Sequence, residues 1–574
     1  MRLHRRLFVV VLAVLCASGM VSWSLFQIQA APARSLDQLV PEGALLYIEA
    51  KDFAGLLKDW NGSPEKAQWL TSDDYRVFSN SRLFLRLSKA SDEFAKAAGV
   101  PPNVKFLNDA AGKESSIAIY NIGNLEFLYV SRMNSGDFLQ SALWQSRNKF
   151  QPRTAAGKPF FARKDEESGR VVAFAMADDY LVLGTREDLV AGALELLSGS
   201  KQHALRQEGW YTQALGAAPS APSDLRMALN LEKIAVTPHF RTYWVQQNIT
   251  EMQGYASAVS DLYREGAVYR EERVILPKKP SADESELARS AQAVSSLLAL
   301  APKDCGFYQA GATDAKASLA VVEQKIVAPH FGAAPAEKLA PQVRLTGGET
   351  GGGSDLETRI DVEPASRIAD ENALTGLQKQ FETANPQAML VAQATRKNSD
   401  GVLLRTSSVI VIAAASDWDL TSVQKAVQDV VAPSVTASRF GVQWREVKDA
   451  GGYYEFDGLS PLQLARRGKL LYFANDAAML SAVLQANGPA PAQPVSYAAG
   501  FSHSRERPNF YEFSALVDSA SVSVAAGSSE REPQFFSGNI AGFSRSFAKI
   551  DSEEMVTRQT RDKIQQTVKY RWTQ

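Results

Sequence analysis

Histidines are the first residues that could support chemistry in this chain of 574 residues. Four of them follow residue 33, and they are far apart: His203, His239, His330 and His503. Local metal sites need short spacings such as H-E-x-x-H, and this motif is absent. His239 follows Pro238 in a loop before an expected helix, where surface exposure or a capping role is the better interpretation. The sequence therefore predicts no metal site and no cofactor.

Clusters of acidic residues are the second candidates, at residues 73–74, 165–167 and 178–179. Two carboxyl groups can hydrolyse a glycoside when they stand at a defined separation in space. Turns and helix starts explain most clusters of this kind. The serine nucleophile motif G-x-S-x-G is absent as well. We therefore predict no catalytic residue, and a hydrolase with an unrecognised acid pair remains a third hypothesis.

A glycine-rich stretch and a single cysteine also deserve a test as chemical sites. Residues 346–355, TGGETGGGSD, lack the lysine that follows a phosphate-binding glycine loop, so they are expected to form a flexible insertion. Cys305 is the one cysteine outside the N-terminal segment, because the other is Cys16. A lone cysteine in an apolar strand is best interpreted as a small buried hydrophobe. Neither feature predicts a binding or catalytic residue.

The elements that would position a site recur along the chain. Residues 39–47, LVPEGALLY, return as residues 300–308, LAPKDCGFY, and residues 179–185, DYLVLGT, return as residues 469–475, KLLYFAN. An amphipathic helix is expected after each second string, with Thr185 and Asn475 as N-caps. Apolar and capping roles persist while polar identities change. The repeat therefore indicates a duplicated scaffold and argues against a duplicated catalytic site.

Apolar periodicity predicts the remaining elements. In the first half, strands are expected at residues 45–50, 115–120, 125–130, 160–161, 171–175, 180–184, 225–231 and 267–276, and helices at 51–60, 73–98, 186–197, 240–263 and 283–298. In the second half, residues 403–413 are matched to the strand at 115, Tyr453-Tyr454 to Phe160-Phe161, residues 509–517 to the strand at 225, and 540–550 to a helix before the terminal strand at 564–572. Hairpin-length strand pairs favour an α+β fold with mostly antiparallel sheets and helices packed on one face.

A proline-lysine segment, Pro277-Lys278-Lys279-Pro280, predicts the domain boundary. The expected organisation is a first α+β repeat at residues 34–277, a linker and helix at 278–299, and a second repeat at 300–574 that contains the insertion at 346–355. The two repeats are expected to form two similar tandem domains.

The N-terminal segment, residues 1–33, has the layout of an export signal. A basic start with Arg2, Arg5 and Arg6 precedes an apolar run at residues 7–26, and small residues follow. A run of this length is also long enough for an uncleaved membrane anchor. We expect an exported protein in the periplasm or another extracytoplasmic space, held at the inner membrane by residues 7–26 if the segment is kept.

The overall charge excludes one class of partner. The chain has 62 basic and 63 acidic residues, a net charge of -1. Nucleic-acid-binding proteins need a basic excess, so no nucleic acid partner is expected.

Three of these features together resemble a family of exported bacterial proteins with a domain of unknown function. They are the strand at residues 39–47, the helix with a Ser-Pro break at residues 60–64, and the strand, cap and helix at residues 181–197. The resemblance covers two tandem copies, although the second copy lacks the Ser-Pro break. It implies no catalytic residues.

Three functions follow in order of preference. The first is a non-enzymatic scaffold or binding module of the bacterial envelope, with an envelope protein or a lipid as partner. The second is a periplasmic carrier or sensor of an apolar ligand such as a lipid, which predicts an apolar cavity in each repeat. The third is the hydrolase named above.

Overall fold

The computed structural model describes most of the chain. The described residues are 34–71, 73–200, 203–238, 252–280, 283–327, 371–397, 404–435, 443–448, 451–456, 461–509 and 549–573. They form two compact units: unit 1 contains residues up to 57 and residues 87–213, and unit 2 contains residues 58–86 and residues from 214 onward. Each unit is described by itself.

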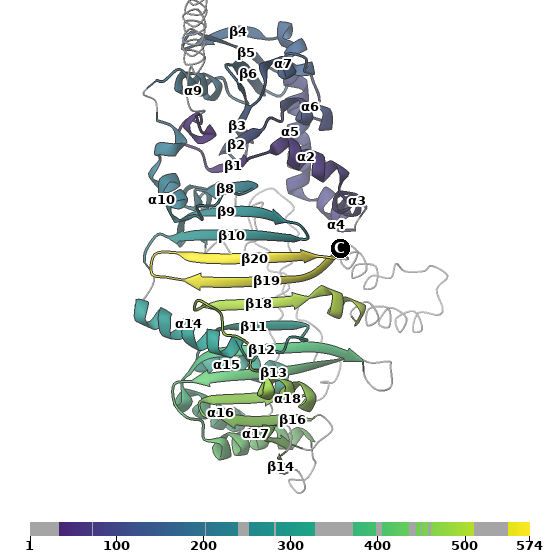
Figure 1. Cartoon of the computed structure of the whole chain (residues 1–574), viewed down its shortest axis with the longest axis vertical. Coiled ribbons are helices and arrows are strands. Elements are labelled where there is room, and N and C mark those ends of the chain that lie inside the picture. Colours follow the sequence, from purple (N-terminus) through teal and green to yellow (C-terminus); the bar gives the residue numbers. More distant parts are fainter. Residues whose placement is uncertain are drawn as a thin grey trace, which may run out of the picture. The chain divides into compact units, whose positions relative to one another are not determined.

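Runs of strands and runs of helices follow one another along the described chain (Figure 1). Before residue 240 they are η1 (Leu36–Gln38), β1 (Leu46–Ala50), α2 (Phe53–Gly62), α3 (Pro64–Leu70), α4 (Asp73–Ser79), α5 (Arg82–Ala98), α6 (Val104–Ala110), β2 (Glu114–Asn121), β3 (Glu126–Arg132), α7 (Ser135–Phe138), α8 (Ala142–Gln145), η2 (Arg147–Lys149), β4 (Gln151–Ala155), β5 (Lys158–Lys164), β6 (Val171–Ala177), β7 (Tyr180–Gly184), α9 (Glu187–Leu197), η3 (Leu205–Gln207), α10 (Gly209–Ala217), β8 (Leu225–Leu229) and α11 (Leu231–Ile234). After residue 251 they are β9 (Tyr255–Glu265), β10 (Val268–Pro277), α14 (Glu284–Leu298), β11 (Phe307–Ala312), α15 (Ala315–Val322), η5 (Glu323–Val327), α16 (Glu371–Ala384), β12 (Pro386–Lys397), β13 (Leu404–Ala414), α17 (Leu420–Val435), β14 (Trp444–Val447), β15 (Tyr453–Phe456), β16 (Leu462–Arg467), β17 (Leu470–Ala474), α18 (Ala477–Gln485), β18 (Tyr497–Ser502), β19 (Ile550–Gln559) and β20 (Ile564–Trp572).

Both units are built on antiparallel sheets. In unit 1 the strand order is β1-β2-β3-β7-β6-β5-β4. In unit 2 it is β8-β9-β10-β20-β19-β18-β11-β12-β13-β17-β16-β15-β14. Every described pairing joins antiparallel strands, so the predicted α+β class with antiparallel sheets is confirmed.

The helices differ from the prediction in their placement, because they cover both faces of these sheets. In unit 2, α15, α16 and α17 pack on one face, while α14 and α18 pack on the other. Alternate residues of β13 show this directly: Ile410 and Ile412 belong to the first core, and Val409 and Val411 to the second. Strands covered on both faces need apolar residues at every position, and β7 is buried at all five.

The two sheets repeat one register. The order β1-β2-β3-β7-β6-β5-β4 recurs as β11-β12-β13-β17-β16-β15-β14, and β8-β9-β10 recurs as β18-β19-β20. Pairing partners can be followed from one strand to the next in both sheets. They are Tyr47, Ala118, Leu128 and Gly184 in the first sheet, and Tyr308, Ala392, Val409 and Ala474 in the second. The ends of these two series are the positions that the repeated sequence strings align. Backbone pairing and sequence therefore give the same correspondence.

Two predicted correspondences in the second half were wrong. Residues 403–413 were matched to β2, but they form β13, the counterpart of β3, and β12 stands in the place of β2. The counterpart of β8 is β18 (Tyr497–Ser502), which pairs with β19 as β8 pairs with β9; residues 510–517 of the predicted match lie outside the described residues. The sequence of β12 contains three alanines and two glutamines, which favour helices, and its strand geometry comes from pairing with β11 and β13.

The helix predicted for residues 240–263 was also wrong, because β9 begins at Tyr255. The inward face of β9 carries Ser257 and Asp261 beside Val259 and Tyr263. Polar residues on the buried face hide the alternation that identifies a strand.

Thr185 and Asn475 share a role other than the predicted N-cap. The N-caps are the next residues, Arg186 and Asp476, and only Asp476 accepts a bond with its side chain, from the Met479 N–H at 2.8 Å. Thr185 and Asn475 instead extend the strand ladder, since each side-chain oxygen lies at a strand end beside a backbone N–H.

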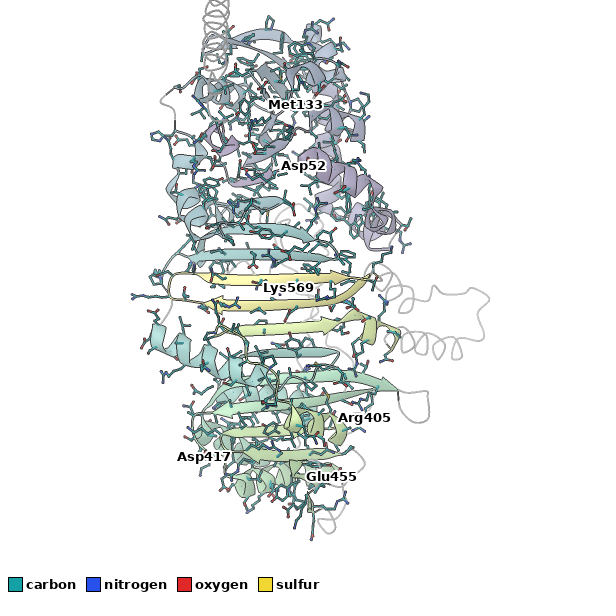
Figure 2. All side chains as sticks on the ribbon, in the orientation of Figure 1. Asp52, Met133, Arg405, Asp417, Glu455 and Lys569 are labelled. Atoms are coloured by element: carbon teal, nitrogen blue, oxygen red, sulfur yellow. The ribbon has the colours of Figure 1, made fainter. Side chains whose placement is uncertain are left out.

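The ladder bonds of these two residues are equivalent. Thr185 Oγ1 accepts from the Phe127 N–H at 2.8 Å, and Asn475 Oδ1 accepts from the Ser408 N–H at 2.7 Å. Phe127 and Ser408 occupy the same register position of β3 and β13. Arg405, labelled in Figure 2, donates to the Asn475 carbonyl in the second copy. A cap and a ladder bond need the same side-chain oxygen, so sequence alone did not separate them.

Replacing Thr185 with valine is expected to lower the free energy of unfolding of unit 1 by about 1–2 kcal/mol. The isosteric change keeps the volume and leaves the partly buried Phe127 N–H without its acceptor. Urea denaturation of the full chain measures the effect. Thr212→Val is the matched control, because Thr212 is exposed, and its cost should stay below about 0.5 kcal/mol. Equal effects of the two substitutions would contradict this role for Thr185.

The predicted boundary segment lies inside unit 2. Asp283 caps α14 by accepting from the Ser285 N–H at 3.0 Å, and α14 packs on β11 and β12. The hairpin of β9 and β10 joins the second half through the β10–β20 pairing, in which Glu271 lies opposite Val568. These main-chain bonds place the strands on both sides of residues 278–299 in one compact unit.

Some predictions concern residues outside the described ranges. They are the export segment at residues 1–33, the glycine-rich insertion at 346–355, and the helix at 540–548. None of the described helices combines the length and the apolar character needed to cross a membrane.

Candidate functional site

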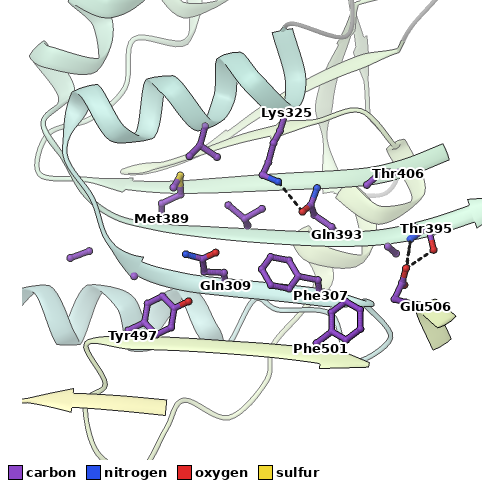
Figure 3. A pocket seen from close by; sticks show the side chains of 15 residues that line it. Phe307, Gln309, Lys325, Met389, Gln393, Thr395, Thr406, Tyr497, Phe501 and Glu506 are labelled. Carbon is purple, nitrogen blue, oxygen red and sulfur yellow. Dashed lines mark hydrogen bonds between the residues drawn. The ribbon is translucent and has the colours of Figure 1, made fainter. Parts of the chain in front are cut away.

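An open pocket of about 500 Å³ lies on the sheet of unit 2 (Figure 3). Strands β11, β12, β13 and β18 form its floor, and α15 with η5 forms one wall. Most of its lining is apolar: Phe307, Val321, Met389, Val391, Tyr497 and Phe501. Ligand sites in proteins have volumes of roughly 300–1,000 Å³ and apolar linings with a few placed polar groups. The pocket fits this description.

Strand alternation directs the lining side chains to one face. On β12 four of the five lining residues, Met389, Val391, Gln393 and Thr395, are each two positions from the next, and Ala394 is the fifth. Register places Phe307 opposite Gln393 and Gly311 opposite Met389. The pocket therefore has a polar end near Gln393 and Thr395 and an apolar end near Met389 and Gly311.

Lys325 is the cation of the polar end. It lies in η5, a single turn of π-helix that continues α15, and such turns are frequent at functional sites. Its ammonium donates to Gln393 Oε1 at 3.0 Å, and Gln393 Nε2 donates to Ser408 Oγ at 2.9 Å. Burial lowers the pKa of Lys325. Among the described residues no carboxylate pairs with this ammonium, so its only hydrogen-bond partner there is a neutral amide.

Glu506 closes the polar end and is saturated with donors. Its carboxylate is buried and accepts from the Thr395 N–H at 3.1 Å and from the Thr395 hydroxyl. Arg505 Nε lies 3.4 Å from Glu506 Oε1, and Asn509 donates to Thr395 Oγ1 at 2.7 Å. A Cβ at Gly306 would stand 1.7 Å from the carboxylate, so only glycine permits this approach. Glu506 is therefore a fixed structural group of the pocket.

The first half has apolar residues where the pocket has polar ones. The register that aligns Tyr47 with Tyr308 and Ala118 with Ala392 puts Ile119 in the place of Gln393 and Ile48 in the place of Gln309. The polar end is therefore a feature of the second half, although an apolar cavity was expected in each repeat.

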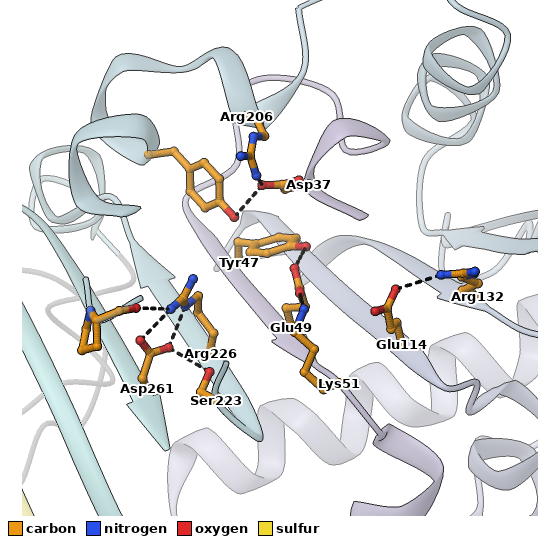
Figure 4. Close-up of polar contacts among 12 residues, drawn as sticks. Asp37, Tyr47, Glu49, Lys51, Glu114, Arg132, Arg206, Ser223, Arg226 and Asp261 are labelled. Carbon is orange, nitrogen blue, oxygen red and sulfur yellow. Dashed lines mark hydrogen bonds and ion pairs between the residues drawn. The ribbon is translucent and has the colours of Figure 1, made fainter. Parts of the chain in front are cut away.

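A second group of buried titratable side chains lies in unit 1 (Figure 4). Asp37 is 3% exposed and accepts from Arg206 Nη1 at 2.9 Å and from the Tyr211 hydroxyl at 3.3 Å. The Tyr47 ring packs edge-on against Tyr211 at 5.6 Å, and its hydroxyl donates to Glu49 at 2.7 Å. Burial raises the pKa of Tyr47 well above its ordinary value, so the hydroxyl remains a donor. The cluster ties η1 to η3 and α10.

The repeated tyrosine is a shared polar side chain that the sequence interpretation passed over. Tyr308 is the counterpart of Tyr47, but its hydroxyl donates to Glu554 of β19 at 3.2 Å. The partner carboxylates come from different elements in the two halves. The tyrosine is therefore kept at one register position while the groups around it differ.

The acidic clusters that fall on described side chains have turn roles. Asp165 accepts from the Ser168 N–H at 2.8 Å in the turn between β5 and β6. Asp178 has a φ of 53° in the turn between β6 and β7 and pairs with Lys158 at 3.1 Å. These turns lie at opposite ends of β6, so the structure does not bring the two clusters together. Asp73 and Asp74 begin α4.

The two described histidines also occupy separate places. His203 is exposed and its carbonyl accepts from the Glu42 N–H at 3.1 Å, while His503 Nε2 lies 3.7 Å from Glu553 Oε1. Burial lowers the pKa of His503, and Glu553 opposes this effect. His239 and His330 lie outside the described residues. Within the described ranges, no group of three or more His, Cys, Asp and Glu side chains is arranged to hold a metal ion.

Cys305 is expected to react slowly with alkylating reagents. It is half-buried, and burial raises the pKa of its thiol from 9.0 to about 11. At pH 8 it should therefore contain about a hundredfold less thiolate than an ordinary thiol. The alkylation rate of the Cys16→Ser full-length chain tests this, with the same chain in urea as the control. Equal rates in the folded and unfolded chains would contradict the expected protection.

Comparisons with known proteins give little further information. No family model matches the chain, and no curated protein matches it. Crystal forms I and III of TP0453 are 8% identical to this chain, cover 46% of it and 86% and 87% of their own length, and have a TM-score of 0.24. Crystal form IV is 9% identical, covers 42% of this chain and 79% of its own, and has a TM-score of 0.21. The resemblance to a family of exported bacterial proteins remains a prediction.

Proposed function

We propose that this protein is a non-enzymatic binding module of the bacterial envelope and that it binds a largely apolar small molecule in the pocket of unit 2. The pocket is the observation that carries this proposal. Its floor is an antiparallel sheet, its lining is mostly apolar, and its charged side chains, Lys325 and Glu506, lie at one end. These properties favour reversible binding of a ligand.

The titratable residues around the pocket support a binding role over a hydrolytic one. Glu506 is held by donors from Thr395 and by Arg505. Paired carboxylates at a fixed separation are the requirement for glycoside hydrolysis. Glu506 is the one carboxylate among the lining residues, so the proposed role needs only recognition.

Location in the envelope is the second part of the proposal. It is supported by the basic and apolar layout of residues 1–33, which predicts export. N-terminal sequencing of the membrane and soluble fractions distinguishes cleavage near residue 31 or 34 from a retained anchor.

A blocking substitution tests the binding proposal. The full-length protein is titrated with Nile red, a neutral dye whose fluorescence rises in apolar surroundings. We expect one saturable site, and we expect Gln309→Trp, which fills the pocket from the middle of β11, to weaken binding at least tenfold. Ala415→Trp is the matched control, because Ala415 is exposed at the end of β13 and does not line the pocket.

The control should bind like the unmodified protein. The circular dichroism spectra of both variants should match that of the unmodified protein. Absence of saturable binding, or equal binding by Gln309→Trp and Ala415→Trp, would overturn the proposal.

A further inference from the structure

We infer that the pocket takes a single-chain anionic amphiphile, with its carboxylate at Lys325 and its apolar chain running along β12 toward Met389. This inference rests on the proposed function and adds the chemical class and the orientation of the ligand. It follows from the charge at one end of the pocket, the apolar surface at the other, and the register that connects them.

The charge of the polar end favours an anion. Lys325 and Arg505 contribute two positive charges, and Glu506 contributes one negative charge that Arg505 already accompanies at 3.4 Å. Lys325 keeps only the Gln393 amide as a described partner. A half-buried ammonium loses solvation without gaining a counter-ion, and an incoming carboxylate restores that lost interaction.

The position of the ligand's carboxylate follows from the hydrogen bonds that the neighbouring donors already make. Thr395 donates with both its N–H and its hydroxyl to Glu506, and Asn509 donates to Thr395. These donors are therefore engaged before a ligand arrives. Lys325 keeps two further ammonium hydrogens beside the one given to Gln393. The carboxylate is accordingly placed at Lys325 and Gln393.

The direction of the chain follows from the strand register. Moving along β12 from Gln393, the inward residues are Val391 and Met389, and the opposite residues of β11 lead from Phe307 through Gln309, the one polar side chain along this path, to Gly311. Tyr497 of β18 lies opposite Gly311 and completes the apolar end. Gly311 has no side chain to obstruct this path, since a Cβ there would lie 3.1 Å from the Tyr497 ring. The groove thus fits one extended chain.

Displacement of Nile red distinguishes the contribution of the ligand's carboxylate to binding from that of its apolar chain. The full-length protein is titrated with lauric acid and with lauryl alcohol, which share a twelve-carbon chain and differ in charge. We expect the acid to bind at least tenfold more tightly, because hydrogen bonds between charged groups are stronger than those between neutral groups. Lys325→Gln should weaken binding of the acid at least tenfold and leave binding of the alcohol within about twofold.

Two further variants control the result. Lys316→Gln removes an exposed lysine of α15 that does not line the pocket, and it should leave both affinities unchanged. Lys325→Arg keeps the charge and should retain most of the binding of the acid. Circular dichroism confirms that each variant is folded.

The pH dependence is an independent readout. Burial lowers the pKa of Lys325 below the ordinary lysine value of 10.5, and a bound carboxylate raises it again. The affinity for the acid should therefore be highest while Lys325 is charged. It should decline as the pH rises through the pKa of Lys325 in the free protein, and this decline should begin below pH 10.5. Glu506 and Arg505 stand at the same end of the pocket. Both remain in the Lys325→Gln variant, so any pH dependence of acid binding that they cause should appear in that variant as well. Lauryl alcohol should show no such decline.

The outcomes distinguish the two proposals. If Nile red shows no saturable binding and neither lauric acid nor lauryl alcohol binds, the proposed function fails and this inference fails with it. If the alcohol binds as tightly as the acid, or if Lys325→Gln weakens both equally, the pocket still binds apolar ligands but the inference of an anionic head is overturned.

Discussion

Replacing Asp261 with alanine is expected to lower the free energy of unfolding of unit 2 by about 3 kcal/mol, the lower end of the range for breaking a buried ion pair. Asp261 is 0% exposed and lies on β9. Its carboxylate accepts two bonds from Arg226, at 2.6 and 2.8 Å, and a third from the Ser223 hydroxyl at 3.0 Å (Figure 4). The substitution removes the counter-ion of a guanidinium that is only 25% exposed.

Urea denaturation measures this loss, and hydrogen exchange of β8 and β9 locates it. Asp59→Ala is the control, because it removes the carboxylate of the exposed Arg264–Asp59 pair and should cost less than about 1 kcal/mol. The double variant Arg226→Met and Asp261→Leu should recover much of the loss, since apolar residues can replace a buried pair. A cost below about 1 kcal/mol for Asp261→Ala would show that the pair does not stabilise the sheet.

Replacing Phe174 with alanine is expected to lower the free energy of unfolding of unit 1 by about 3–5 kcal/mol. Phe174 lies in β6, is fully buried, and stands at the centre of an aromatic cluster. The ring centroids around it lie 5.1 to 6.4 Å away, in Phe150, Phe161, Phe138 and Trp144. Alanine leaves a cavity under α7 and α8 and also removes these ring contacts.

Graded substitutions distinguish cavity formation from a general loss of folding. Phe174→Leu keeps most of the volume and should cost about 1–2 kcal/mol in the same denaturation experiment. Leu107→Ala, on the outside of α6 with 36% exposure, should cost less than about 1 kcal/mol. If Phe174→Ala costs no more than Leu107→Ala, the cluster is not the core of unit 1.

The elements predicted most accurately depend on neighbouring residues. The terminal strand at residues 564–572 and the strand at 180–184 have the predicted bounds, and α14 (Glu284–Leu298) begins one residue after the predicted start at residue 283. Alternation, a short apolar run and a capping side chain act within one element, so the sequence displays them directly.

The elements that were missed depend on distant partners. The composition of β12 favours a helix, and its strand conformation is imposed by hydrogen bonds to β11 and β13. The buried Asp261 conceals the strand character of β9, and only the pairing with Arg226 of β8 makes its burial favourable. Likewise, Thr185 could cap a helix or extend a ladder until the position of Phe127 was known.

The sequence by itself determined the α+β class, the antiparallel sheets and the correspondence of the two repeated strings, because these follow from local patterns and from the repetition itself. Only the tertiary structure decided that helices cover both sheet faces and that Lys325, Gln393 and Glu506 meet at one pocket. Residues 325, 393 and 506 belong to separate elements and form no motif, so their proximity depends on the register of β11, β12 and β18. Register is set by packing over the whole sheet, which no local pattern records.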